Sequence, residues 1–481
     1  MGTEVLVAKF ISLAERLIEM IQSGQFVFGE RIASIRQLAQ SHQVSKNTVI
    51  KALVELERLG YVEARSRQGF FVCWRYEGQT EAQPATIVSA MPKAVNLSTV
   101  FHTLMERGAA FDCYPSAKEK YVSPYLPSLL QCINRNHKSA LAELSGYYDE
   151  PQGNLALRVQ IAHRYRQRGT LVDASDVVVT SGCQNALFLA LNTVTSPGDT
   201  VAVESPAFYG VLQLLEQLGL KVIEIPMLPQ GGMDIERLES ISRNHRIAAA
   251  VVTPTYATPT GRSMSEQNKQ ALLELAELRD FFIVEDDIYG EMGLLQQTSP
   301  LFQFDIYNRV ILCGSMSKCL SRDLRVGWLI SPRFQHQILR QKLGSQLASA
   351  QSVQLGLAEF MAKGDFRRHL NHFRKYLLLQ RNLLLSELKT YWPSSVSYVM
   401  PEGGLTLWLR MPEHIDSQAL YQQMLQNHVV LTPGLLFASD HRFNNYIRLS
   451  YHQPLQGERL QALRRAASFV KQLLAAKDAS S

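Results

Sequence analysis

The chain has 481 residues and a mass of 54.2 kDa, more than one hydrophobic core usually stabilises, so at least two domains are expected. Hydrophobic residues make up 46% of the sequence and charged residues 19%, a composition that excludes a disordered protein. The formal net charge is +6 at pH 7. So small an excess permits a polyanionic partner but does not by itself indicate one.

The six cysteines form no C-x-x-C pair, and no histidines stand at zinc-finger spacing. We therefore expect neither a disulfide framework nor a bound metal. The N-terminus lacks the pattern of a signal peptide, and no stretch is apolar for long enough to span a membrane. These features predict a cytoplasmic protein without a membrane segment.

Residues 1–75 are predicted to form a helix-turn-helix followed by a hairpin. The predicted helix over 45–59 carries apolar side chains at helical spacing on one face and polar side chains at its start. A short helix over 35–42 precedes it, and Arg65 and Arg67 lie at the tip of the hairpin. Such a second helix is typical of one that enters the major groove of DNA, although any amphipathic helix has a solvated polar face.

The winged-helix domain of GntR-family bacterial regulators resembles this module in four runs, Gly29–Ala39, Val44–Val49, Ala52–Leu53 and Leu59–Tyr61. The family's usual Leu-Pro-Ser stands here as Ile32-Ala33-Ser34, without the proline. The resemblance implies that the module binds an operator in double-stranded DNA. The residues expected to contact the duplex are Ser34, Arg36, Ser45, Lys46, Asn47, Thr48, Lys51, Arg65 and Arg67.

Residues 76–95 are polar with little periodicity and are predicted to be a linker. Beyond residue 175, β-branched runs alternate with amphipathic helices, which predicts a large α/β domain with a mostly parallel sheet. The last hundred or so residues are predicted to form a smaller α+β lobe. The predicted strands are Val177–Thr180, Val201–Glu204, Val222–Ile225, Ala248–Thr253, Phe281–Glu285, Val310–Cys313 and Val326–Ile330.

Candidate functional residues follow these strands, where ligands bind in open α/β sheets. Lys318 stands just past a predicted strand, near Ser315 and Arg325, in the surroundings expected of a Schiff-base lysine beside a phosphate clamp. Gly182 and Cys183 open a helix whose free N–H groups suit a phosphate. The pattern indicates a carbonyl cofactor that carries a phosphate.

Three further residues suit an aromatic ring in such a cofactor. Asp286 can face a protonated ring nitrogen, Tyr289 can hydrogen-bond a ring hydroxyl, and Phe208 can cover the ring face. Each has an ordinary alternative: an acidic pair at a strand end is commonly a cap, and a lone phenylalanine belongs to a core. The order of all these elements along one chain favours the cofactor site.

The same elements resemble the fold-type I, class I aminotransferases, the family of aspartate aminotransferase, over residues 96–475. The resemblance implies that pyridoxal phosphate forms a Schiff base with Lys318 and that Arg448 binds the carboxylate of an amino acid. It also implies that Tyr148 reaches the phosphate of a neighbouring subunit, which requires a homodimer. One residue departs from the family, because Thr258 stands where an asparagine is usual.

A winged helix fused to an aminotransferase-like domain resembles the MocR and GabR type of GntR-family regulator. We therefore predict a transcriptional regulator that senses an amino acid or amine through aldimine exchange at Lys318, in the bacterial cytoplasm and on the nucleoid when bound to DNA. The alternatives are a working aminotransferase with an accessory DNA-binding domain, or a regulator whose effector is pyridoxal phosphate itself. Transaminase activity stays open at this point.

Overall fold

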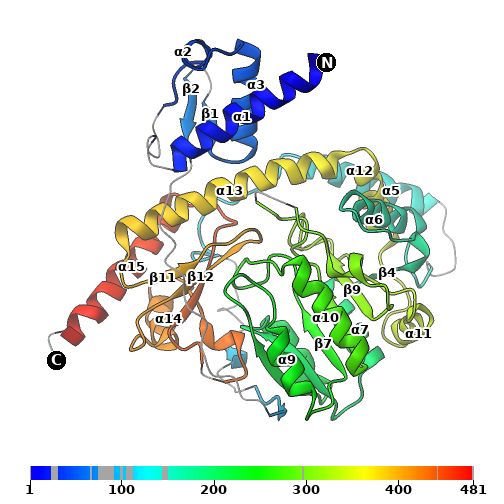
Figure 1. The fold of residues 1–481 in the computed structure, drawn as a ribbon. Coiled ribbons are helices and arrows are strands. Elements are labelled where there is room, and N and C mark those ends of the chain that lie inside the picture. Colours follow the sequence, from blue (N-terminus) through cyan, green and yellow to red (C-terminus); the bar gives the residue numbers. More distant parts are fainter. Residues whose placement is uncertain are drawn as a thin grey trace.

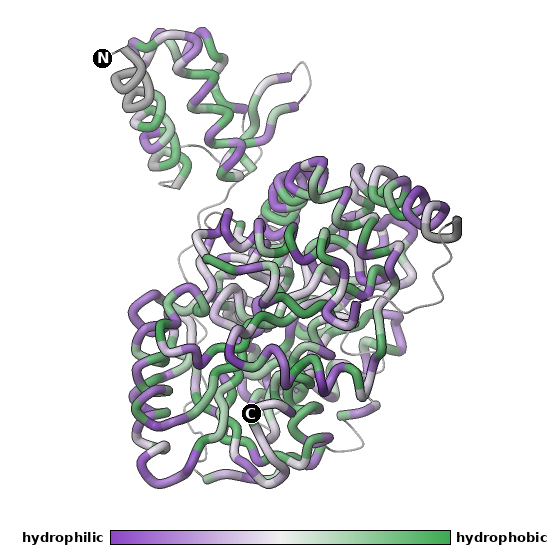
Figure 2. The backbone as a smooth tube through the Cα atoms, turned by 90° about the vertical axis from the view of Figure 1, so that its right-hand side faces the viewer, coloured by the Kyte–Doolittle hydropathy of each residue, from purple (hydrophilic) through white to green (hydrophobic). Residues whose placement is uncertain are grey.

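The computed structural model describes residues 2–22, 26, 31–65, 68–73, 91–97, 101–103, 112–142, 150–294, 297–440 and 442–478. The chain forms a small N-terminal lobe and a larger body, and the small lobe lies above the long helix α13 (Asp365–Tyr391) (Figure 1). Figure 2 shows the same small lobe at one end of the larger body in a second view.

The small lobe is a winged helix. It consists of α1 (Gly2–Gln22), α2 (Ile35–Ser41), α3 (Lys46–Arg58) and the antiparallel hairpin of β1 (Val62–Arg65) and β2 (Gly69–Val72). Ser34 and Ser45 cap the second and third helices, because their hydroxyls accept from the N–H groups of Gln37 and Thr48. The lobe has its own core of Leu13, Leu17, Ile21, Leu38, Val49, Leu53, Leu56, Val62 and Val72.

The larger body is built on an eight-stranded sheet with the strand order β3-β6-β5-β7-β8-β9-β10-β4. Its strands are β3 (Lys93–Ala94), β4 (Val177–Thr180), β5 (Thr200–Ser205), β6 (Lys221–Pro226), β7 (Ala249–Val252), β8 (Phe282–Asp286), β9 (Val310–Ser315) and β10 (Gly327–Ile330). The predicted parallel sheet is confirmed for β6, β5, β7, β8 and β9. β10 runs antiparallel to both β9 and β4, and β3 runs antiparallel to β6.

Helices cover both faces of this sheet. On one face α7 (Cys183–Val194), α8 (Tyr209–Gln217) and α11 (Gln335–Ser345) pack onto the strands, and on the other α9 (Ile235–Ser242) and α10 (Glu266–Arg279) do. Beside β4 and below α13 lie α5 (Leu126–Ala142), α6 (Leu155–Gln167) and α12 (Gln351–Ala362). The all-buried pattern of β4, β5, β7 and β9 follows from this covering on two sides.

The C-terminal lobe contains a second, four-stranded antiparallel sheet with the order β11-β12-β14-β13. Its strands are β11 (Ser397–Val399), β12 (Thr406–Arg410), β13 (Thr432–Pro433) and β14 (Tyr446–Ser450), and its helices are α14 (Ser417–Gln426) and α15 (Gly457–Asp478). Together with α13 they match the predicted α+β lobe.

One finding bears on the predicted boundary between residues 95 and 96. Residues 93–94, which we assigned to the linker, form the edge strand β3 of the large sheet, so that sheet begins before residue 96. Most of the predicted linker, residues 76–90, lies outside the described residues. Within the described part, no helix is long and apolar enough to cross a bilayer.

Candidate functional site

The carboxyl ends of β4, β5, β7, β8 and β9 meet at one edge of the large sheet, because these strands share one direction. Ligands of open α/β sheets bind at this edge. Asp286 pairs with Cys313 across β8 and β9, which brings the acid next to the strand that leads to Lys318. The sheet register therefore gathers the predicted cofactor residues in one place.

Lys318 lies three residues after β9, in a turn rather than in a strand. Burial, followed by the positive charges of Arg448 and Arg322, lowers the pKa of Lys318 to about 7. The nearby carboxylate of Asp286 works in the opposite direction. A neutral amine is the nucleophilic form of lysine, so this lowered pKa suits attack on an aldehyde.

Asp286 is 2% exposed at the end of β8. Its Oδ1 accepts from the Cys183 thiol at 3.2 Å and from the Ile288 N–H at 3.2 Å. Burial raises the pKa of Asp286 to about 6, while these two hydrogen bonds lower it. The carboxylate is therefore mostly ionised at neutral pH in a dry site, which suits a partner for a protonated ring nitrogen.

The same hydrogen bond shows how the Cys183 side chain is used and leaves the prediction for its backbone N–H unchanged. Its side chain donates to Asp286 and so does not point at a phosphate. What Cys183 still offers a phosphate is its backbone N–H, because it is the first residue of α7. The sequence could not distinguish these uses, since a residue at a helix start presents its main chain and its side chain in different directions.

The start of α7 forms a cradle that fits a phosphate. Gly182 precedes the helix with φ of +102°, and no side chain caps the helix there. A Cβ on Gly182 would lie 2.7 Å from Arg325 Nη2, so only glycine fits between the helix and that guanidinium. Arg325 also donates to the Ser181 carbonyl at 2.8 Å. Open N–H groups beside an arginine are the donors that a phosphate needs.

The hydroxyl of Ser315, a predicted phosphate ligand, already has partners within the protein. Ser315 is buried, and its hydroxyl is within hydrogen-bond distance of the Val326 carbonyl at 2.9 Å and of Ser317 Oγ at 3.0 Å. Its single hydroxyl proton is therefore directed into the protein. To donate to a phosphate, Ser315 would have to give up one of these bonds.

Tyr289, Phe208 and Thr258 lie around the same edge. Tyr289 is 2% exposed, and burial raises the pKa of its phenol. The Thr258 hydroxyl lies near enough to lower that pKa, yet it forms no hydrogen bond of ordinary geometry within the described residues. Phe208 precedes α8 and packs against Tyr209 with ring centroids 4.7 Å apart.

Arg448 comes from β14 in the C-terminal lobe and is 2% exposed. Its Nη2 donates to Thr432 Oγ1 at 3.1 Å, and its guanidinium lies 5.7 Å from the Tyr209 ring and 5.4 Å from the Phe437 ring. Its charge reaches both Lys318 and Tyr289. A buried arginine beside the lysine is placed to attract a carboxylate.

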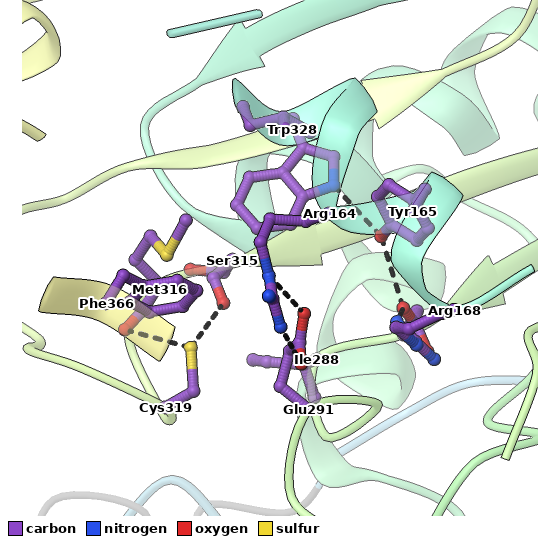
Figure 3. A pocket seen from close by; sticks show the side chains of 12 residues that line it. Arg164, Tyr165, Arg168, Ile288, Glu291, Ser315, Met316, Cys319, Trp328 and Phe366 are labelled. Carbon is purple, nitrogen blue, oxygen red and sulfur yellow. Dashed lines mark hydrogen bonds and ion pairs between the residues drawn. The ribbon is translucent and has the colours of Figure 1, made fainter. Parts of the chain in front are cut away.

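A polar network that the sequence analysis missed supports Asp287, the neighbour of Asp286 (Figure 3). Arg168 forms a bidentate ion pair with Asp287, and Tyr165 donates to Asp287 Oδ2 at 3.1 Å. Trp328 Nε1 donates to the Tyr165 hydroxyl at 3.1 Å, and Thr255 donates to Asp287 Oδ1 at 2.8 Å. This network ties β8 to α6, β10 and the loop after β7, and so fixes the strand end that carries Asp286.

A second cluster lies beside the first (Figure 3). Arg164 binds Glu291 through two hydrogen bonds of 3.1 and 2.7 Å, and Arg374 of α13 reaches the same carboxylate at 3.1 Å. These partners are more than eighty residues apart in the chain, so sequence spacing gives no sign of them.

A cavity of about 300 Å³ opens at Lys318, and among the described residues predicted to bind the cofactor or the carboxylate only Lys318 lines it. Its lining is largely polar, and basic side chains outnumber acidic ones in it. The polar residues of the lining are Tyr121, Ser123, Ser317, Lys318, Ser321, Arg322, Asp323, His369, His452 and Gln453.

The predicted DNA-contacting residues are mostly exposed on the winged helix. Lys46, Asn47 and Lys51 are exposed on α3, as are Ser34 and Arg36 at the start of α2. Ser45 is exposed but uses its hydroxyl as the cap of α3. Arg65 is exposed and pairs with Glu63 at 2.6 Å.

Thr48 was predicted to contact DNA, but the structure buries it. It is 3% exposed, and its hydroxyl lies 2.8 Å from Ser45 Oγ. Its side chain therefore belongs to the helix cap and does not reach outward. Arg67 and Tyr148 lie outside the described residues.

The sequence matches the aminotransferase class I and II family over residues 125–462 and the gntR family of bacterial regulatory proteins over residues 12–72. It is 32% identical over 467 residues to YjiR, an uncharacterized HTH-type transcriptional regulator of Escherichia coli, covering 96% of this chain and 98% of the relative. The chain belongs to the MocR type of GntR-family transcriptional regulators. TauR, an HTH-type transcriptional regulator of Rhodobacter capsulatus, is 27% identical over 464 residues, covering 91% and 92%.

Solved structures place the larger body of this MocR-type regulator in fold type I. The kynurenine aminotransferase of Pyrococcus horikoshii, in complex with PMP, superposes with a TM-score of 0.69 at 26% identity, covering 79% of this chain and 95% of that one. The α-aminoadipate aminotransferase LysN of Thermus thermophilus, complexed with N-(5'-phosphopyridoxyl)-L-leucine, gives a TM-score of 0.70 at 25% identity, covering 79% and 96%. Pyridoxal phosphate is accordingly the cofactor of this domain.

Proposed function

We propose that this regulator senses a small amino acid or amine at Lys318 and reports its presence through the winged helix. The observation that supports this most directly is the position of Lys318, partly buried and within reach of the charges of both Asp286 and Arg448, with its pKa lowered to about 7. A reactive amine and a carboxylate-binding arginine at one site fit an amino acid as the ligand.

Each residue of the site would contact a different part of the cofactor. Pyridoxal phosphate, when bound, supplies an aldehyde carbon that condenses with primary amines. Asp286 would hold the ring nitrogen in its protonated form, and Tyr289 and Phe208 would contact the ring hydroxyl and the ring face. The N–H groups of Gly182 and Cys183, with Arg325, would bind the phosphate.

Sensing would then consist of the release of Lys318 Nζ when an effector amine binds. Pyridoxal phosphate would be held covalently by Lys318 Nζ, and the nitrogen of an effector amine would take the place of Nζ on the cofactor carbon. Nζ would gain the two hydrogens that the effector ammonium loses, and Lys318 would be released as an ordinary amine. No electrons are transferred, and no water is consumed. Arg448 binds the carboxylate of an amino-acid effector and so holds its nitrogen near the reacting carbon.

Regulation requires that the two states of Lys318 hold the winged helix differently, because a ligand shifts a population only by its differential affinity. A coupling of about 1 to 3 kcal/mol changes DNA affinity roughly 5- to 150-fold. We propose that residues 1–75 form the DNA-binding domain and residues 96–475 the pyridoxal-phosphate domain, with the added strand at 93–94, and that two chains form a homodimer.

The direct test is a spectral titration of the purified protein with a panel of amino acids and amines, repeated with a duplex selected from a random pool for binding to it. We expect one class of amine to shift the cofactor absorbance and to change DNA affinity over the same concentration range. Turnover of an amino donor at about 1 per second or faster, with DNA binding indifferent to that donor, would contradict the proposal and favour an aminotransferase. DNA binding that follows pyridoxal phosphate without any amine would make the cofactor itself the effector.

A further inference from the structure

A close contact joins the winged helix to α13. Gly60, with φ of +74°, lies so near Leu378 that a Cβ on it would stand 1.6 Å from Leu378 Cδ2. Asn382 Nδ2 donates to the Cys73 carbonyl at 3.2 Å, one turn farther along α13. Leu378 and Asn382 are both buried. The winged helix is therefore seated on one stretch of α13 (Figure 1).

The contacting residues of the winged helix are tied to its DNA-binding helix. The Cys73 N–H donates to the Tyr61 carbonyl at 3.0 Å, and the Cys73 thiol donates to the Gly60 carbonyl at 3.2 Å. The Tyr61 N–H in turn donates to the Leu56 carbonyl in α3 at 2.9 Å. A shift at this contact is thus passed to the orientation of α3.

Next to this contact, a groove lies between the winged helix and α13. A groove of about 560 Å³ separates Glu57, Val62 and Glu63 of the winged helix from His372 and Lys375 of α13. Because of this groove, few interactions hold the winged helix on α13. The position of the winged helix can therefore change at a low cost in free energy.

Arg381 lies directly below this contact, with an exposed fraction of 4%. Its Nε and Nη2 donate to Asn382 Oδ1 at 3.2 and 3.0 Å, and its Nη1 donates to the Pro401 carbonyl at 3.1 Å. Burial lowers its pKa, and among the described residues no carboxylate forms an ion pair with it. A buried cation that pairs with no carboxylate of the described segments costs stability, so its presence there calls for a role other than stabilisation.

Pro401 leads from Arg381 to the cofactor site. A Cβ on Gly261 would lie 2.4 Å from Pro401 Cβ, and the Glu402 N–H donates to the Gly261 carbonyl at 2.9 Å. Gly261 ends the turn that begins at Thr258, whose hydroxyl faces Tyr289. Packed atoms and hydrogen bonds therefore run from the winged helix through Asn382, Arg381 and Pro401 to Gly261, in the turn that carries Thr258.

We infer that Arg381 and Asn382 are positioning residues that couple the state of Lys318 to the position of the winged helix on α13. In this coupling, Arg381 holds the Asn382 amide in the orientation that binds Cys73, and it does so only while Pro401 keeps its place beside the 258–261 turn. The inference rests on the proposed function, because it names how the sensing site would act on DNA binding.

The test measures hydrogen exchange of the full-length, pyridoxal-phosphate-loaded protein before and after addition of aminooxyacetate, which condenses with aldehydes and carries a carboxylate. In the unsubstituted protein we expect the amides of Tyr61 and Cys73 to change their exchange rates about 5-fold or more. In Arg381→Met this response is expected to disappear, while the absorbance change caused by aminooxyacetate stays as in the unsubstituted protein. Asn382→Ala, which leaves the guanidinium and Pro401 in place, should lose the exchange response in the same way.

Arg367→Met is the matched control, because Arg367 is an exposed arginine on the same helix, and it should keep both responses. A full exchange response in Arg381→Met and Asn382→Ala would overturn the inference. So would an absorbance change in the unsubstituted protein without any exchange response. Absence of the absorbance change would instead contradict the proposed function, so the two failures are distinct.

Discussion

The winged helix and the cofactor edge present their functional side chains in opposite ways. Lys46, Asn47 and Lys51 are exposed on a helix that buries its other face, whereas Asp286 and Arg448 are each 2% exposed. Contact with DNA needs solvated cations that can release counterions, and their contributions add up residue by residue. Covalent capture of an amine needs a desolvated lysine, for which each neighbour matters. Substitutions are therefore expected to act all-or-none at one site and gradually at the other.

The largest effect is expected from Lys318→Ala. Without this amine the side chain cannot bond to pyridoxal phosphate, so the visible absorbance of the lysine-bound cofactor and the shift that marks its displacement by an amine should both be lost. Absorbance spectra after incubation with the cofactor measure this directly. Lys221→Ala, at an exposed lysine of β6, should keep both signals, and their retention in Lys318→Ala would remove Lys318 from the site.

Arg448→Lys tests the carboxylate site and should have the next largest effect. A lysine keeps the charge but loses the planar pair of donors that matches a carboxylate. Loss of a charged hydrogen bond of about 1.5 to 3 kcal/mol should weaken amino-acid binding roughly 10- to 100-fold. Spectral titration with an amino acid and with the matching amine that lacks the carboxylate measures the difference. Equal weakening for both compounds would show that Arg448 does not bind the carboxylate.

On the winged helix, replacing Lys46 and Lys51 together by alanine should weaken binding to all DNA sequences alike. Each phosphate contact contributes about 0.9 to the slope of log affinity against log salt, so the slope should fall by roughly 1.8. Fluorescence anisotropy at several salt concentrations measures it. Lys138 and Lys471, exposed lysines of the larger body, provide the control pair. An unchanged slope would mean that Lys46 and Lys51 do not contact the DNA phosphates.

The pH dependence of cofactor capture separates a buried lysine from an exposed one. With a pKa of about 7, the neutral fraction of Lys318 falls as pH drops below that value and is complete above it. The capture rate of the apoprotein should therefore fall about tenfold per pH unit below 7 and level off above about 8. Stopped-flow absorbance gives this profile. A rate that still rises tenfold per unit at pH 9 would mean that Lys318 behaves as an exposed lysine.

The sequence predicted most of the architecture because burial constrains composition. The β-branched runs gave the strands of the large sheet to within one or two residues, since strands covered on both faces must be apolar throughout. The antiparallel direction of β10 was not predictable, because the run Val326–Ile330 has the same composition whichever way it points. The edge strand β3 is only two residues long, too short to show any period.

Within the site, the sequence predicted which residues gather but not where each side chain points. Lys318 follows β9, Asp286 ends β8 and Arg325 stands just before β10, and the topology brings them together. Cys183 and Ser315 also lie there, yet their side chains bond to Asp286 and Val326. The ion pair of Arg168 with Asp287 joins residues 119 positions apart, so only the folded chain reveals it.

The smallest effect is expected from Cys183→Ala, which removes the thiol donor from Asp286 without touching the lysine. Because that hydrogen bond lowers the pKa of Asp286, its loss should raise the pKa above about 6, by about one unit or less for a bond of roughly 1 kcal/mol. The carboxylate then becomes protonated at higher pH, so the loss of cofactor affinity on the acidic side should begin at a higher pH. Equilibrium titrations with pyridoxal phosphate between pH 5 and 8 measure this loss of cofactor affinity. Cys183→Ser keeps a donor and should restore most of the original profile; identical profiles for serine and alanine would show that the thiol fills space without tuning Asp286.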